Sequence, residues 1–137
     1  MIRSYHDSDY GKLYELYQHN EWFGGQFDEA RDGREKLARK IAQDPDSIWV
    51  YEKDGKLIGS ISLMDDGRVA WLFRFVVKNH DPKVAKELYN KVIPIFKKHG
   101  HTQIIAYSPV GDEVLAKRYE NLGMTKGNSY TAYWTDI

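Results

Sequence analysis

Three adjoining segments between residues 47 and 77 constrain the fold more than any other part of the chain. The segments SIWVYEK, KLIGSISLM and RVAWLFRFVV are rich in β-branched and aromatic residues, and the dipeptides Asp54-Gly55 and Asp66-Gly67 separate them. An Asp-Gly pair favours the positive backbone φ angles of a two-residue hairpin turn, whose twist matches that of the flanking strands. The sequence therefore predicts a three-stranded antiparallel meander.

The third of these strands has a regular apolar pattern. Its alternate positions are Val69, Trp71, Phe73, Phe75 and Val77. Because successive side chains of a strand point to opposite faces, we expect one strongly apolar face, with Arg74 as a polar interruption of the other face. A glycine inside the second strand, Gly59, predicts either a bulge or a close approach of another backbone.

Apolar residues at helical spacing predict four helices around the meander. The expected boundaries are a first helix that ends near His19, a second from about Asp32 to Ala42, a third from Pro82 to about His99, and a fourth capped by Asp112 and stopped by Gly123. Short strands are expected at 2–5 and 102–107, and Gly127-Asn128 predicts a final hairpin.

The element order predicts the fold class. A strand, two helices, three strands, a helix, a strand, a helix and a strand pair give one domain over residues 1–137. We expect a mixed α/β (α+β) fold with a central, mostly antiparallel sheet of six or seven strands and four flanking helices. A right-handed crossover supplies its one parallel pair.

Composition excludes several function classes. The formal net charge is zero, with 20 basic and 20 acidic residues, so a nucleic-acid partner is not expected. There is no cysteine, which excludes thiolate catalysis, and the five histidines lack metal-ligand spacing with acids. No apolar stretch is long enough to span a membrane and the first residues lack a signal peptide, so we expect a cytoplasmic protein without a membrane partner.

Two phrases resemble a known family. DGKLIGSISL at 54–63 and AKRYENLGM at 116–124 resemble the second hairpin and the penultimate helix of the GNAT superfamily of acyl-CoA-dependent N-acyltransferases. The resemblance covers almost the whole chain. It implies that acetyl-CoA lies in a wedge between segments 68–77 and 103–107, where its pantetheine arm bonds to the main chain of Phe75, Val76 and Val77.

The family's pyrophosphate loop is only partly present. The family has Arg or Gln at the position of His80, Gly at that of Lys83, and Gly or Ala at that of Ala85. Only Ala85 fits this pattern. The expected cofactor contacts on this loop and on the last helix are Lys83, Val84, Ala85, Lys86 and Asp112. As a helix cap before Pro82, Asp81 would satisfy the first amides itself, so lysine ammonium groups are expected to neutralise the phosphates. A capped helix start with solvated lysines fits the same residues.

The resemblance also implies a catalytic group. Tyr119 occupies the family's position for the tyrosine that protonates the departing CoA thiolate, although a tyrosine packed in the core fits that position too. The central strand offers no acid, so the general base stays open among Asp65, Asp66, His80, a water chain or an amine of low pKa. The acceptor would lie against the aromatic residues Trp22, Phe23 and Phe27, which fit a plain core role as well.

Two functions are compatible with this sequence. The first is an acetyl-CoA-dependent N-acetyltransferase that acts on a primary amine of a small molecule or a protein. The second is a GNAT-like domain that has lost the cofactor and serves as a binding or assembly module. A homodimer is compatible with both.

Overall fold

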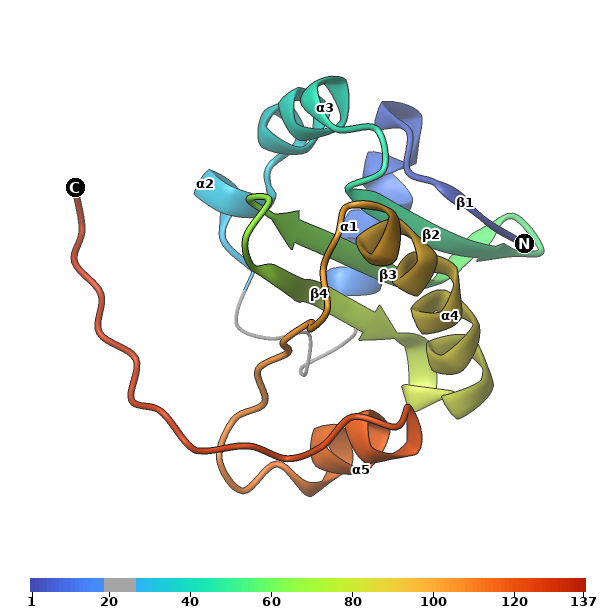
Figure 1. Ribbon diagram of the computed structural model, residues 1–137. Helices are drawn as coiled ribbons and strands as arrows, with labels where there is room; N and C mark the ends of the chain where they lie inside the picture. Colours follow the sequence, from blue (N-terminus) through green and yellow to red (C-terminus); the bar gives the residue numbers. More distant parts are fainter. Residues whose placement is uncertain (19–26) are drawn as a thin grey trace.

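The computed structural model describes residues 1–18 and 27–137, and its centre is one antiparallel sheet (Figure 1). Four strands follow one another in the order β1-β2-β3-β4, and each pairs with its neighbour in antiparallel fashion. Their bounds are β1 (Ile2–Ser4), β2 (Ile48–Lys53), β3 (Lys56–Asp65) and β4 (Ala70–Val77). The predicted meander is confirmed as β2, β3 and β4.

The two turns of the meander differ from one another. Asp54 and Gly55 both have positive φ angles, of 52° and 73°, as a two-residue hairpin turn requires. The second connection is longer, because β3 ends at Asp65 and β4 begins at Ala70. In it the Asp66 carboxylate accepts hydrogen bonds from the amides of two following residues, which stabilises a wider loop.

A β-bulge in β4 overturns the predicted alternation of that strand. Arg74 has a φ of 46°, and the pairing with β3 shifts between Ser60 and Ser62, so one extra residue is accommodated on β4. Because the extra residue reverses the order of the faces, the core on one side receives Ala70, Leu72, Phe75 and Val77. The prediction that Val69, Trp71 and Phe73 share one apolar face with Phe75 and Val77 is therefore wrong for the three residues before the bulge. It is confirmed for the two residues after it.

Helices cover both faces of the sheet. The four expected helices are present as α1 (Tyr10–Gln18), α3 (Arg34–Gln43), α4 (Pro82–Lys98) and α5 (Glu113–Asn121), and a one-turn helix α2 (Glu29–Asp32) precedes α3. In Figure 1, α4 lies in front of the sheet and α1 behind it. Two cores result, one between α4 and the sheet and one between α1, α3 and the opposite face. Among the described residues, no helix is long and apolar enough to cross a membrane.

Gly59 allows α4 to lie close to the sheet. A Cβ atom at this position would lie 2.8 Å from Leu88 Cδ1 and 2.9 Å from Val84 Cγ1, which is closer than van der Waals contact permits. The close neighbours are thus two α4 side chains and not a backbone. The predicted bulge is confirmed, because the pairing of β2 with β3 shifts where Tyr51 pairs with Gly59 and Glu52 pairs with Leu57.

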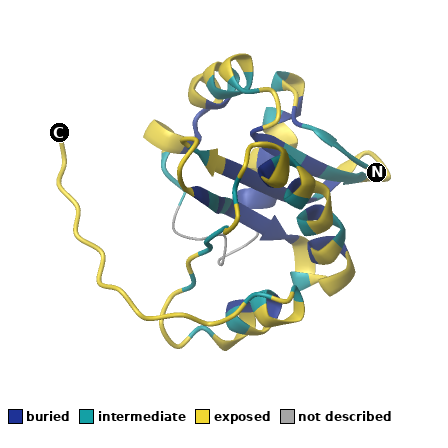
Figure 2. Ribbon diagram, viewed as in Figure 1, coloured by how far each residue is buried: buried dark blue, intermediate teal, exposed yellow. Residues whose placement is uncertain are grey.

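The sheet has fewer strands than the six or seven predicted. Segment 102–107 contributes a single parallel bridge, in which Ile105 bonds to Ala70 and Leu72 at 3.0 and 2.9 Å. This bridge confirms the parallel crossover but not a full strand. Residues 124–137 form no strand and all but Met124 are exposed, so the predicted final hairpin is wrong (Figure 2). A hairpin must bury an apolar face, and residues 125–137 bury none against the described part of their own chain.

Candidate functional site

A cleft lies between α4 and α5. Its volume is about 620 Å³, which is in the range of ligand-binding pockets. Lys86, Lys117 and Arg118 bring three positive charges to its wall, against one acid, Glu113. Ala85, the one residue that fits the family's loop pattern, also lines it. A cleft with this charge suits an anionic ligand.

The start of α4 is capped from within the chain. The Asp81 carboxylate accepts hydrogen bonds from the amides of Lys83 and Val84, at 2.9 and 3.3 Å. The predicted cap is confirmed, and these amides are not free to bind a phosphate. The side chain of Val84 is buried in the core, while Lys83 is exposed and does not line the cleft.

The loop before α4 has a left-handed conformation without any glycine. Asn79 and His80 have φ angles of 55° and 52°. Asparagine tolerates this region and histidine adopts it less often, so surrounding contacts must hold the loop in place. Arg118 supplies one such contact, a hydrogen bond to the His80 ring.

Arg118 joins the last helix to both the strand and the loop. Its Nη1 donates to the carbonyl oxygen of Phe75 at 3.0 Å, and its Nη2 donates to His80 Nδ1 at 2.9 Å. Because a guanidinium only donates, His80 Nδ1 is unprotonated and its proton lies on Nε2. Burial, together with the Arg118 charge, lowers the pKa of His80, so this imidazole is neutral at neutral pH.

The charge of Arg118 is buried without a carboxylate partner in the described part of the chain. Only 7% of the residue is exposed, and burial lowers the pKa of its guanidinium. The Asp112 carboxylate caps α5 by accepting from the Leu115 amide at 3.0 Å, and its Oδ2 is buried without a hydrogen bond. Two of the five guanidinium N–H groups are used, so Arg118 retains donors for an anion in the cleft.

Sequence reasoning missed Arg118. The signal that points to it is its spacing, because Leu115, Arg118 and Leu122 follow at intervals of three and four on one helix face. A charge in an otherwise apolar stripe requires a polar partner in the fold. The partner, the Phe75 carbonyl, is distant in sequence and was not predictable.

Tyr119 lies beside Arg118 and packs toward the core of α4 and β4 instead of lining the cleft. Burial raises the pKa of its phenol, although the Arg118 charge opposes that shift. Its hydroxyl makes no hydrogen bond with the described residues, so the structure lacks the backbone bond expected of a purely structural tyrosine. The phenol therefore stays protonated at neutral pH, the form that a proton donor needs.

The strand end predicted to hold pantetheine is buried. Phe75, Val76 and Val77 are at most 3% exposed, and Arg118 occupies the Phe75 carbonyl. Phe27 packs against the α1 core and meets Tyr14 edge to face at 5.2 Å. The other two aromatic residues of the predicted acceptor site, Trp22 and Phe23, lie outside the described residues.

A second, smaller cavity of about 190 Å³ lies on the opposite face, at the bulge of β4. There Arg74 forms a buried, bidentate ion pair with Asp32, with both N–O distances at 2.9 Å. Arg31, Lys36 and Lys40 surround this cavity. Sequence reasoning identified Arg74 as an unusual polar residue but did not identify its partner.

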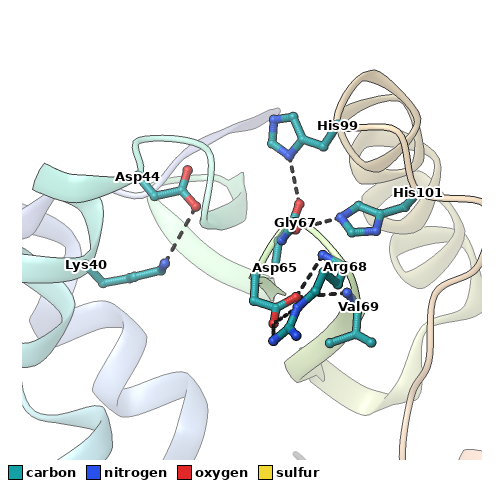
Figure 3. Close-up of polar contacts among 9 residues, drawn as sticks. Lys40, Asp44, Asp65, Gly67, Arg68, Val69, His99 and His101 are labelled. Atoms are coloured by element: carbon teal, nitrogen blue, oxygen red, sulfur yellow. Dashed lines mark hydrogen bonds and ion pairs between the residues drawn. The ribbon is translucent and has the colours of Figure 1, made fainter.

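Two candidate bases prove to be engaged elsewhere. Asp65 bonds to His99 Nδ1 at 2.8 Å and to His101 Nε2 at 2.6 Å, near the end of α4 (Figure 3). The Asp66 carboxylate bonds to amides of its own turn and to the Arg68 guanidinium, which together hold its pKa far below the usual range. Neither lines the α4–α5 cleft. No cluster of three metal-ligating side chains occurs within residues 1–18 and 27–137.

A sequence profile described as the acetyltransferase (GNAT) family matches residues 10–124. No curated protein sequence matches the chain. Solved structures with a similar fold include the aminoglycoside 6'-N-acetyltransferase of Acinetobacter haemolyticus, with a TM-score of 0.76 and 15% identity over 100% of this chain and 99% of the other.

Two further solved structures share this fold. The glucosamine-6-phosphate N-acetyltransferase of Arabidopsis thaliana has a TM-score of 0.72 and 20% identity over 99% of this chain and 98% of the other. The PaiA N-acetyltransferase of Thermoplasma acidophilum, solved with coenzyme A, has a TM-score of 0.72 and 23% identity over 88% and 87% of the two chains.

Proposed function

Since the chain belongs to the acetyltransferase (GNAT) family, we propose that it transfers an acetyl group from acetyl-CoA to a primary amine. Members of this family use an acyl-CoA. A small-molecule acceptor is favoured over a protein, because two proteins of similar fold are named for an aminoglycoside and for glucosamine-6-phosphate.

The observation that carries the proposal is the buried cation in the α4–α5 cleft. Arg118 keeps free N–H donors there, and Lys86 and Lys117 add charge at the wall. A guanidinium and two ammonium groups suit phosphate oxygens, whereas the first amides of α4 are already bonded to Asp81. The residues present thus fit a phosphorylated cofactor through side chains, and Ala85 leaves room beside them.

In this proposal Tyr119 donates a proton to the departing CoA thiolate. When bound, acetyl-CoA supplies a thioester whose leaving thiol has a pKa of about 8.5, while a phenol has a pKa of about 10. Burial raises the Tyr119 pKa further, so the phenol holds its proton until a thiolate develops next to it. A raised pKa therefore keeps the acid in its active form at neutral pH.

Two observations favour a second function. Asp81 caps α4 and would oppose a phosphate at that helix end. A domain that had lost the cofactor and served as a binding or assembly module would show such a cap. Asp112 also favours this function, because the family often has an asparagine seven residues before its catalytic tyrosine, and in this chain that position carries an acid.

Calorimetric titration with acetyl-CoA and with CoA separates the two functions. The acetyltransferase binds both at micromolar to low millimolar concentration, and release of free CoA thiol then identifies acceptors among amino sugars, polyamines and amino acids. An absence of binding at millimolar concentration overturns the acetyltransferase. Lys98→Met, at an exposed lysine away from the cleft, controls for general effects of charge.

A further inference from the structure

The smaller cavity, at the bulge of β4, has a wall with more positive than negative charge. Four cations line it, namely Arg31, Lys36, Lys40 and Arg74, and Asp32 is the one acid among the described residues that do so. Three cations remain after Asp32 and Arg74 neutralise one another in their ion pair. A hollow with this balance of charge attracts an anionic ligand.

Two of these cations, Lys36 and Lys40, are neighbours on α3. They are four positions apart, so they lie on the same side of the helix, and like charges at this spacing destabilise a helix slightly. Lys36 is exposed and forms no ion pair with the described residues, while Lys40 Nζ lies 3.6 Å from the Asp44 carboxylate. An anion at the mouth of the cavity would relieve the repulsion between the two ammonium groups.

Asp32 keeps one acceptor position in the wall of the same cavity. Its carboxylate accepts hydrogen bonds from the Asp28 amide and from Arg74 Nε and Nη2, each at 2.9 Å. A carboxylate has about four acceptor positions, so one is left beyond these contacts with the described residues. An N–H group of a bound amine can donate to that position.

The cavity and the α4–α5 cleft adjoin the same stretch of β4. Phe73 and Arg74 line the cavity, and the carbonyl of the next residue, Phe75, accepts a hydrogen bond from Arg118 in the wall of the cleft. Bulges occur often beside active sites, because the extra residue changes the direction of the side chains around it. An amine bound at Asp32 would therefore lie near the strand segment that Arg118 contacts from the cleft.

Size and charge narrow the class of acceptor. The cavity volume is about 190 Å³, which is below the roughly 300–1,000 Å³ of pockets for drug-sized ligands, so a molecule as large as an aminoglycoside does not fit. A polyamine carries several positive charges and is repelled by the lysines and arginines of the wall. A small amine with an acidic group fits the volume and pairs with these cations.

We propose that the acceptor is a small primary amine that carries a carboxylate or a phosphate. Lys36 and Lys40 hold the acidic group, and the amino group donates to Asp32. This inference rests on the proposed acetyltransferase function. In the transfer, the amine nitrogen forms a C–N bond to the acetyl carbon as the C–S bond breaks. Tyr119 gives a proton to the departing thiolate and regains one, through solvent, from the amine nitrogen.

Matched pairs of acceptors test the need for an acidic group. The thiol-release assay compares alanine with alaninamide, and phosphoethanolamine with ethanolamine, so the members of each pair differ in the acid. The acidic member of at least one pair is expected to have a kcat/KM roughly tenfold higher or more, as a charged hydrogen bond provides. The pair with the larger ratio shows whether carboxylate or phosphate is preferred. Equal turnover within both pairs, or turnover of the neutral members alone, overturns the inference.

Substitution of the two lysines tests where the acidic group binds. Lys36→Met/Lys40→Met is expected to raise KM for the acidic acceptor by about tenfold or more and to leave KM for its neutral partner unchanged. Arg39→Met is the matched control, at an exposed cation of α3 that does not line the cavity. If the double variant and Arg39→Met have the same KM for the acid, the inference is wrong.

Direct binding separates this inference from the proposed function. Amide NMR of the full chain without cofactor follows titrations with alanine and with phosphoethanolamine, and at least one of them is expected to shift the signals of Lys36 and Lys40. No shift at about 10 mM, ten times a weak Kd of about 1 mM, overturns the inference even if acetyl-CoA binds. Shifts in a chain that does not bind acetyl-CoA would support the acidic-ligand site and reject the acetyltransferase.

Discussion

Arg118 on α5 donates a hydrogen bond of 3.0 Å to the carbonyl oxygen of Phe75 on β4. The same guanidinium holds His80, so one buried cation connects the last helix, the central strand and the loop before α4. The connection brings a positive charge to the wall of the cleft at a helix start whose own amides are occupied by Asp81. Anion binding in this cleft therefore depends on side chains.

Arg118→Met should weaken CoA binding by about tenfold or more. A hydrogen bond to a charged group contributes about 1.5–3 kcal/mol, and about 1.4 kcal/mol corresponds to a factor of ten. Calorimetry at low and at high salt measures the effect, and the variant should show a weaker salt dependence than wild type. Lys98→Met should bind CoA as wild type does, because Lys98 is exposed and lies outside the cleft. Equal affinities for Arg118→Met and wild type would contradict a phosphate-binding role.

Tyr119→Phe should lower kcat by about 10²–10⁴ and leave the affinity for CoA nearly unchanged, because only the proton donor is removed. The matched control is Tyr89→Phe, at a tyrosine on α4 whose pKa burial also raises. Steady-state kinetics with a thiol-release assay and CoA calorimetry supply the two readouts. A loss of affinity without a loss of kcat would instead assign Tyr119 a packing role.

Asp32→Asn should lower the free energy of unfolding by about 3–5 kcal/mol. Asp32 and Arg74 are 2% and 4% exposed, and the substitution removes the buried carboxylate charge that pairs with the Arg74 guanidinium at 2.9 Å. Urea denaturation followed by circular dichroism measures the change. Asp7→Asn, which breaks the exposed ion pair with Arg34, should change the urea midpoint little. Similar losses of unfolding free energy in both variants would show that the loss in Asp32→Asn does not come from burial of the ion pair.

Asp65→Asn should lower the free energy of unfolding at neutral pH. It should also make that free energy vary less as the pH falls into the acid range. Burial tends to raise the pKa of Asp65, but the Gly67 amide, His99 and His101 outweigh it and hold the pKa below the usual 3.8. A carboxyl group with a lowered folded pKa contributes stability above its unfolded pKa, and that contribution is lost as the pH falls through the folded value.

Urea midpoints at about pH 7 and about pH 3 test this dependence. The difference between wild type and Asp65→Asn should be largest at neutral pH and shrink in acid. Asp54→Asn is the control, since Asp54 lies in a turn and its side chain makes no hydrogen bond with the described residues. A difference that does not change with pH would rule out the carboxylate as its source.

Local features of this fold were predictable from the sequence. The Asp54-Gly55 turn, the Asp81 cap and the limits of α4 depend on residues within a few positions of one another, so the sequence shows both partners of each interaction. The positions of Tyr119 and Asp112 on or beside the last helix follow from its cap and its stopping glycine. In the candidate site, Ala85 and Lys86 were expected and line the cleft.

Features that join distant segments were not predictable. The bulge at Arg74 reverses the faces of β4, and the bulged residue forms a buried ion pair with Asp32, 42 positions away. The alternation prediction assumed an unbroken strand, which a bulge violates without any local signal. The predicted final hairpin failed for a related reason, because a turn dipeptide determines a hairpin only when a surface is present to cover it.

The sequence by itself determined the meander, the helices and the capped start of α4, because hydrogen bonds and turn angles between near neighbours fix these. Only the tertiary structure decided that Arg118 meets Phe75 and His80, which lie 43 and 38 positions away in the chain. A buried guanidinium requires acceptors, and the fold supplies them from whichever strand and loop pack beside its helix. The charge of the cleft is therefore a property of packing between elements.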